Sequence, residues 1–88
     1  MRLIKLEQPN CNPCKMVSNY LEQANFQFET VDVTKEPEVA ARFGVMGVPV
    51  TILLSDQGEE IKRSIGFKPD ELDELLKELR QKGNFKQT

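Results

Sequence analysis

The hydrophobic positions of the chain follow two different periods, which predict alternating strands and helices. Residues 2–8 and 26–33 are short segments rich in branched and aromatic side chains, as is typical of buried strands. Between them, apolar residues recur at helical spacing and predict a helix from residue 12 to about residue 25: Met16, Val17, Tyr20, Leu21 and Ala24. A strand, a helix and a second strand in this order imply a right-handed crossover between two parallel strands.

The second half of the chain predicts two helices and a hairpin. A short helix over 35–43 would begin after Thr34, whose hydroxyl can cap it, and would end at Gly44. Residues 50–55 and 59–65 are strand-like and are separated by a turn. The last helix begins near Pro69, is expected to end at Gly83, and has one leucine face: Leu72, Leu75, Leu76 and Leu79.

The predicted order of elements is β-α-β-α-β-β-α, which indicates an α/β fold. One four-stranded mixed sheet with helices on both faces would bury the apolar side of every helix. We therefore expect a single domain over residues 1–83, followed by a flexible tail at 84–88.

Length and charge remove several classes of function. A chain of 88 residues with a net charge of −2 fits one domain without the basic patch that nucleic-acid binding requires. The longest apolar run, residues 48–54, is too short to span a membrane. The N-terminal segment is not typical of a secretion signal, because Lys5 and Glu7 interrupt its apolar run. We expect a cytoplasmic protein that binds neither membranes nor nucleic acid.

The chain has no histidine and two cysteines. Histidine is the commonest metal ligand and the commonest general base, and two cysteines alone cannot complete a tetrahedral zinc site. We therefore expect no metal and no bound cofactor.

The two cysteines form the motif Cys11-Asn12-Pro13-Cys14, where the first strand leads into the first helix. Their i, i+3 spacing places both side chains on one face, so that a disulfide can close. Cys11 lies at the helix N-terminus, where free N–H groups favour the attacking thiolate, and Cys14 lies one turn inside. An inert buried pair and a metal site are the alternatives, but the carboxyl end of a parallel strand favours redox chemistry.

At this point the sequence resembles the thioredoxin family. Residues 11–15 are similar to that family's Cys-Gly-Pro-Cys-Lys, and residues 36–50 are similar to the segment that ends in its cis-proline. A weaker match is Gly66-Phe67, before the last helix. The resemblance covers nearly the whole chain but not the first strand and helix of full-length thioredoxins, so the compact form is similar to glutaredoxins and small bacterial or phage redoxins.

The resemblance implies roles for individual residues. Cys11 would be the nucleophile, Cys14 the resolving cysteine, and Pro49 a cis-proline beside the pair. The backbone of Val48 would pair with an extended client segment. For Phe67, packing in the core is an equally good interpretation. The client-binding residues that we expect are Asn12, Pro13, Met46, Val48 and Phe67.

The sequence also departs from the family pattern. Asn10 stands where the family usually has tryptophan, and Lys5 stands where it often has a buried aspartate. Lys5 is expected to extend its amine to solvent, although its charge could instead lower the pKa of a thiol. The group that deprotonates Cys14 is therefore not identified. The Gly-Gly and Asp feature that holds glutathione in glutaredoxins is missing around Gly66.

These features together predict a thiol–disulfide oxidoreductase that acts as a monomeric protein-disulfide reductant. Its partners would be disulfide-containing client proteins, and a flavin-dependent thioredoxin reductase would recharge it. Two alternatives remain at this stage: a dedicated electron donor for ribonucleotide reductase, and a redox-inert module that binds peptides beside Pro49.

Overall fold

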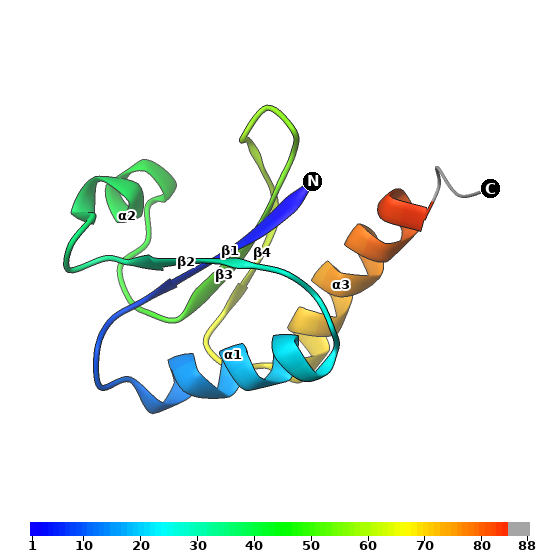
Figure 1. Cartoon of the computed structure of the whole chain (residues 1–88). Helices are drawn as coiled ribbons and strands as arrows, with labels where there is room; N and C mark the ends of the chain where they lie inside the picture. The colour runs from blue at the N-terminus through cyan, green and yellow to red at the C-terminus, as the bar shows by residue number, and fades with distance from the viewer. Residues whose placement is uncertain (85–88) are drawn as a thin grey trace.

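The computed structural model describes residues 1–84 of the chain, and Figure 1 shows their arrangement. The order of elements is the one that the sequence predicts. The elements are β1 (Arg2–Glu7), α1 (Asn12–Gln23), β2 (Glu29–Asp32), α2 (Pro37–Phe43), β3 (Val50–Leu54), β4 (Glu60–Ile65) and α3 (Pro69–Asn84).

The four strands form one mixed sheet in the order β2-β1-β3-β4. β1 runs parallel to β2 and antiparallel to β3, and β3 runs antiparallel to β4. The central position of β1 and β3 explains why most of their residues are apolar, because a strand covered on both faces exposes neither side to water. Every residue of β3 is buried, as are the four central residues of β1. The predicted α/β fold with a mixed sheet is confirmed.

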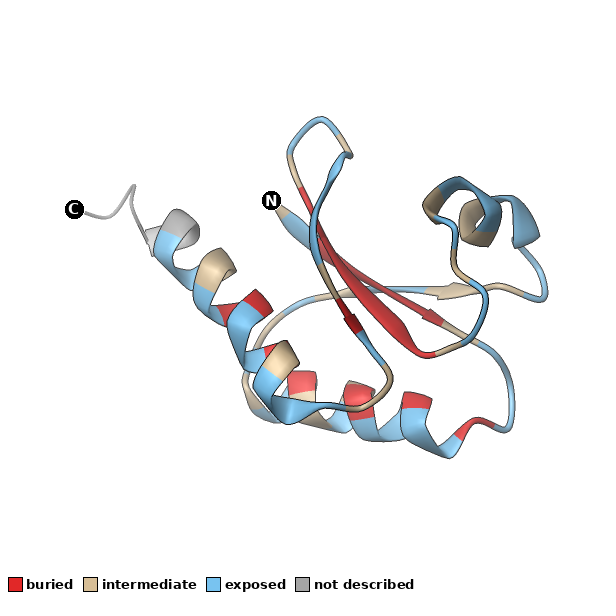
Figure 2. Ribbon diagram, turned by 180° about the vertical axis from the view of Figure 1, so that it is seen from behind, coloured by how far each residue is buried: buried red, intermediate tan, exposed pale blue. Residues whose placement is uncertain are grey.

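The core lies in two clusters, one on each face of the sheet. Successive residues of a strand point to opposite faces, so Leu3 packs with α1 and α3, whereas Ile4 and Leu6 pack toward α2. Figure 2 shows the buried residues concentrated in the central strands and on the inward sides of α1 and α3. None of the seven residues of α2 is buried, although Val39, Ala40 and Phe43 contact the core.

Several boundaries differ from the sequence predictions. β2 has four residues, and Phe26 and Phe28 lie before it, packed against the core on the α1 and α3 side. Thr34 does not cap α2, because its N–H and hydroxyl both donate to the Asp32 carboxylate. The helix begins later, at Pro37. Gly44 does end α2, with the left-handed backbone (φ +66°) that glycine adopts readily.

Two further expectations are wrong. Met16 is 48% exposed, so it belongs to the outer surface of α1 rather than to its buried stripe. Gly83 does not end the last helix, because α3 continues to Asn84. The rest of the predicted tail, residues 85–88, lies outside the described residues.

Glu71 in the first turn of α3 joins this helix to β4. Its carboxylate accepts hydrogen bonds from the Ile65 N–H at 3.2 Å and from the Ser64 hydroxyl at 3.0 Å. The Lys68 ammonium lies 3.8 Å away. The hydrogen bond from the Ile65 N–H holds the pKa of Glu71 below its usual value, and the hydrogen bond from the Ser64 hydroxyl and the charge of Lys68 act in the same direction.

This lowered pKa predicts an acid-dependent loss of stability. A carboxylate whose pKa is lower in the folded state stabilises the fold above its unfolded pKa, and this contribution is lost as the pH falls through the folded value. Glu71→Gln is therefore expected to flatten the decline in urea midpoint between about pH 7 and about pH 3. Glu74→Gln, at an exposed position on the same helix, is the control. An unchanged acid decline in the Glu71 variant would contradict the expectation.

Candidate active site

The two cysteines lie where β1 leads into α1. Asn10 turns the chain with a positive φ of 61°, and Cys11 then occupies the N-cap of the helix. Cys11 and Cys14 are joined by a disulfide, with their Cα atoms 5.2 Å apart. Pro13 lies in the first turn, where the absence of its N–H leaves no helical hydrogen bond unmade.

The surroundings of the pair distinguish the two sulfur atoms. The backbone N–H of Cys14 donates to the Cys11 sulfur at 3.2 Å, a contact that stabilises negative charge on that atom once the disulfide is reduced. Cys11 is 8% exposed and Cys14 is 2% exposed, so a partner can reach Cys11 more easily. The geometry therefore favours Cys11 for attack from outside and Cys14 for attack from within.

Pro49 lies at the same end of the sheet as the cysteines. Leu6 pairs with Val50 across β1 and β3, so the residues after β1 and before β3 emerge side by side. The Val48–Pro49 peptide bond is cis, and the Pro49 carbonyl accepts a hydrogen bond from the Gly66 N–H at 2.8 Å.

A groove of about 350 Å³ runs along the loop that contains Pro49. It is lined by the loop residues 44–50 and by Arg63, Ile65 and Gly66. Met46 is 99% exposed and Ile65 is 56% exposed, so an apolar rim faces outward. Arg63 spans this region, because its guanidinium donates to the Phe43 carbonyl at 2.7 Å and to the Glu60 carboxylate at 2.6 Å.

The remaining predicted client-binding residues divide between two places. Asn12 and Pro13 are exposed in the first turn of α1, between the two cysteines. Phe67 packs against the core, with its ring edge-on to Tyr20 at 6.1 Å between centroids. Phe67 is not among the residues that line the groove beside Pro49, and its role toward clients stays a prediction.

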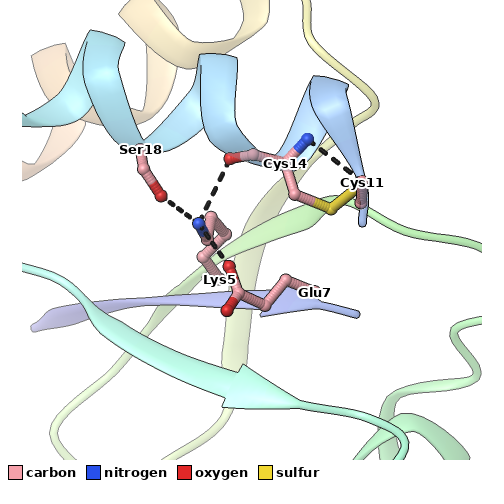
Figure 3. Close-up of a disulfide and its surroundings, with 5 residues drawn as sticks. All are labelled: Lys5, Glu7, Cys11, Cys14 and Ser18. Carbon is pink, nitrogen blue, oxygen red and sulfur yellow. Dashed lines mark hydrogen bonds and ion pairs between the residues drawn. A yellow bond between two sulfur atoms is a disulfide. The ribbon is translucent and has the colours of Figure 1, made fainter. Parts of the chain in front are cut away.

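Lys5 is the residue whose position the sequence did not predict. Its side chain is 1% exposed, so the expectation that its amine reaches solvent is wrong. Figure 3 shows its ammonium beneath the first turns of α1, where it donates to the Cys14 carbonyl at 3.2 Å and to the Ser18 hydroxyl. The Glu7 carboxylate lies 2.7 Å from the ammonium. The burial follows from strand geometry, since Lys5 lies on the same face of β1 as Leu3.

Two other kinds of site are absent from residues 1–84. This part of the chain contains no group of three or more His, Cys, Asp or Glu side chains that could share a metal ion. Within the same residues, none of the helices is long and apolar enough to cross a membrane.

Comparison with known proteins identifies the family. Residues 1–79 match the family model described as Thioredoxin. The chain belongs to the thioredoxin family. It is 91% identical over 80 residues to the SPbeta prophage-derived thioredoxin-like protein YosR of Bacillus subtilis (strain 168), covering 91% of this chain and 100% of that protein. It is also 39% identical to a thioredoxin of the same organism, over 77% of this chain and 71% of that one.

Solved structures of the family agree with the fold. The oxidised form of mitochondrial thioredoxin 3 from Saccharomyces cerevisiae superimposes with a TM-score of 0.73 at 28% identity, covering 88% of this chain and 76% of that one. Fasciola hepatica thioredoxin gives 0.72 at 27% identity, covering 88% and 80%. Family membership and the bonded cysteine pair together support thiol–disulfide oxidoreductase chemistry at Cys11 and Cys14.

Proposed function

We propose that this protein is a reductant of protein disulfides, with Cys11 as the nucleophile and Cys14 as the resolving cysteine. The observation that carries the proposal is the cysteine pair at the N-terminus of α1, at the same end of the sheet as an apolar groove. The pair supplies two electrons, and the groove supplies a surface for a polypeptide client.

The reaction proceeds in two exchange steps. The Cys11 thiolate attacks one sulfur of a client disulfide, forms a mixed disulfide, and releases the other client sulfur as a thiolate that takes up a proton. Cys14 then loses its proton and attacks the Cys11 sulfur. The second client sulfur leaves as a thiolate and is protonated in turn. Two electrons and two protons pass to the client, and the Cys11–Cys14 disulfide remains.

The groove binds the client as an extended segment. The Val48 backbone pairs with this segment in the manner of an added strand, while Met46 and Ile65 contact its side chains. An apolar rim at the same end of the sheet as the cysteine pair suits the segments around a disulfide that becomes exposed in a partly opened protein.

Ile65→Asp is expected to raise KM for a protein disulfide roughly tenfold, because a charge at the rim must lose water when an apolar client binds. The kcat should change little, since the substitution leaves both cysteines in place. Insulin reduction measures this effect, and reduction of a small aromatic disulfide serves as the internal control. Ile61→Asp is the matched variant, because Ile61 is 44% exposed on the same strand but outside the groove lining. Equal effects of both substitutions would argue against the groove as the client site.

A thioredoxin reductase is the proposed source of electrons. The Cys-Asn-Pro-Cys-Lys motif follows the thioredoxin pattern, and the glycine pair that binds glutathione in glutaredoxins is absent from residues 64–68 of the sequence. The cytosol, where thioredoxin and glutathione keep thiols reduced, is the proposed site of action. The protein is proposed to act there as a monomer.

The experiment is oxidation of NADPH coupled to the reduction of insulin. We expect turnover with a flavin-dependent thioredoxin reductase and none with glutathione plus glutathione reductase. Turnover only with glutathione would move the protein to the glutaredoxin class. Support of ribonucleotide reductase without insulin reduction would indicate a dedicated donor, and a cysteine pair that cannot be cycled would indicate a peptide-binding module.

A further inference from the structure

A charged lysine lies in the middle of the core, beside the redox pair. The Lys5 ammonium is held by the Glu7 carboxylate, the Cys14 carbonyl and the Ser18 hydroxyl (Figure 3), and it lies 5.7 Å from the centre of the Phe28 ring. Removing the Lys5 ammonium from water is costly, and an ion pair with a buried partner seldom repays this cost in stability. Stability alone therefore does not explain Lys5.

Lys5 belongs to a polar row that crosses the sheet beneath α1. It pairs in register with Thr51 of β3, which pairs with Ser64 of β4, and all three side chains are buried. The Thr51 hydroxyl has no hydrogen-bond partner among residues 1–84. Buried polar groups without partners are rare. Packing of the core alone therefore does not explain why these three positions are polar.

We propose that the Lys5–Glu7 ion pair controls the ionisation of Cys14, with Lys5 as a positioning residue that favours the Cys14 thiolate. This inference rests on the proposed function, because it concerns the resolving step. The family position that often holds an acid holds a base here, so the control acts through a positive charge next to the helix and a negative charge behind it.

The arrangement of charges gives the expected sign. The ammonium contacts the Cys14 backbone directly, and the carboxylate contacts the ammonium from the strand side (Figure 3). A positive charge close to a thiol favours the thiolate, and a negative charge opposes it. Lys5 contacts the Cys14 backbone and is almost completely buried, whereas Glu7 is partly exposed to water, which screens its charge; the effect of Lys5 is therefore expected to outweigh that of Glu7.

Charged groups on the other surrounding elements are engaged elsewhere or lie in solvent. On α1, Lys15 is exposed next to Cys14. On β2, the Asp32 carboxylate accepts hydrogen bonds from Thr34. On α3, Glu71 accepts from Ser64 and Ile65. On β4, Arg63 donates to Glu60 and to the Phe43 carbonyl.

The chemical consequence falls on the second exchange step. Cys14 must lose a proton to solvent before its sulfur attacks Cys11, and an equivalent proton ends on the client thiolate that leaves. A higher thiolate fraction of Cys14 shortens the life of the mixed disulfide. It also stabilises the reduced protein relative to the disulfide, which raises the reduction potential.

The test measures Cys14 alone, in a Cys11→Ser background, through the ultraviolet absorbance of its thiolate against pH. Lys5→Met removes the charge and keeps a chain of similar length. We expect the ionisation midpoint to rise, with a roughly tenfold fall in the thiolate fraction at neutral pH. Adding Glu7→Gln removes the remaining negative charge and should restore part of that loss.

The double variant separates charge from packing. A purely structural role predicts that the second substitution adds damage, whereas electrostatic control predicts recovery. An unchanged midpoint in Lys5→Met, or a further rise in the double variant, would overturn the proposal. Lys62→Met with and without Glu74→Gln is the matched control, because this exposed pair lies near the end of β4 remote from the cysteines.

Glu7→Gln alone covers the case in which Lys5→Met fails to fold. The partly exposed Glu7 side chain tolerates a neutral replacement, and the midpoint should then fall below that of the Cys11→Ser parent. A midpoint that stays or rises would again refute the proposal. None of these measurements uses a client or a reductase. Failure of insulin reduction therefore counts against the proposed function only, and an unmoved midpoint counts against this inference only.

Discussion

Cys14→Ser is expected to stop turnover and to leave the protein covalently bound to its clients. In the proposed mechanism the first attack uses Cys11, which this substitution leaves in place at the helix N-terminus. The second attack needs a sulfur one turn inside the helix, and a serine hydroxyl cannot take its place as a nucleophile toward a disulfide at neutral pH. The mixed disulfide therefore accumulates. Non-reducing gels of the variant after exposure to cell extract, followed by reduction, measure the trapped clients.

The matched control is Cys11→Ser, which keeps the buried thiol and removes the accessible one. It should trap few or no clients, because Cys14 is almost completely covered. Both variants should lose insulin reduction entirely. Equal trapping by the two variants would contradict the assignment of Cys11 as nucleophile and Cys14 as resolving residue.

Leu72→Ala should destabilise the fold by about 2–5 kcal/mol. Leu72 is fully buried between α3 and the sheet, where it packs with Leu3, Leu53 and Leu21. The substitution removes buried methyl groups and leaves a cavity that the surrounding helix and strands can close only in part. Since single domains have a total stability of roughly 5–15 kcal/mol, this loss is a large fraction of the whole.

Urea unfolding followed by circular dichroism measures this effect as a fall in the midpoint. Ile61→Ala is the control, because it also removes an aliphatic side chain but from an exposed position of β4. The control should lose less than about 1 kcal/mol. Similar losses at the two positions would contradict the placement of Leu72 in the core.

The order of elements could be predicted from the sequence because burial imposes it directly. β1 and β3 are covered on both faces and are mostly apolar, and the leucines of α3 repeat at the spacing of one helix face. Gly44 ended its helix as expected, because left-handed backbone is a local requirement of the chain.

The errors fall where tertiary contacts decide between local options. The Thr34 hydroxyl could either cap the N-terminus of α2 or bind a neighbouring side chain, and it donates to the Asp32 carboxylate. Met16 fits a helical stripe, but the buried side of α1 is formed by Cys14, Val17 and Leu21, and Met16 lies outside it. Phe26 and Phe28 have strand-like composition, yet they serve the core from a connecting segment.

The residues of the candidate site also differ in how readily the sequence predicts them. Cys11 and Cys14 could be found because their chemistry depends on local spacing and on a helix terminus, both of which the sequence states. The hydrogen bonds of Lys5 were harder to predict, because they join a strand to residues that lie one and two turns into a helix. One signal was available: Lys5 lies two residues after Leu3, on the same face of a strand that is otherwise apolar.

The absence of any buried residue in α2 makes the loop that lines the groove mechanically unlike the helix that carries the cysteines. The cysteines stand on α1, which places Cys14, Val17 and Leu21 in the core, whereas the Met46 loop is continuous with α2. Segments with few buried contacts open locally at low free energy, so amide hydrogens should exchange fastest in α2 and slowest in β1 and β3. In the proposed function, the sulfur atoms thus keep a fixed geometry while the groove loop yields, which would let one small protein accept disulfides set in differently shaped surfaces.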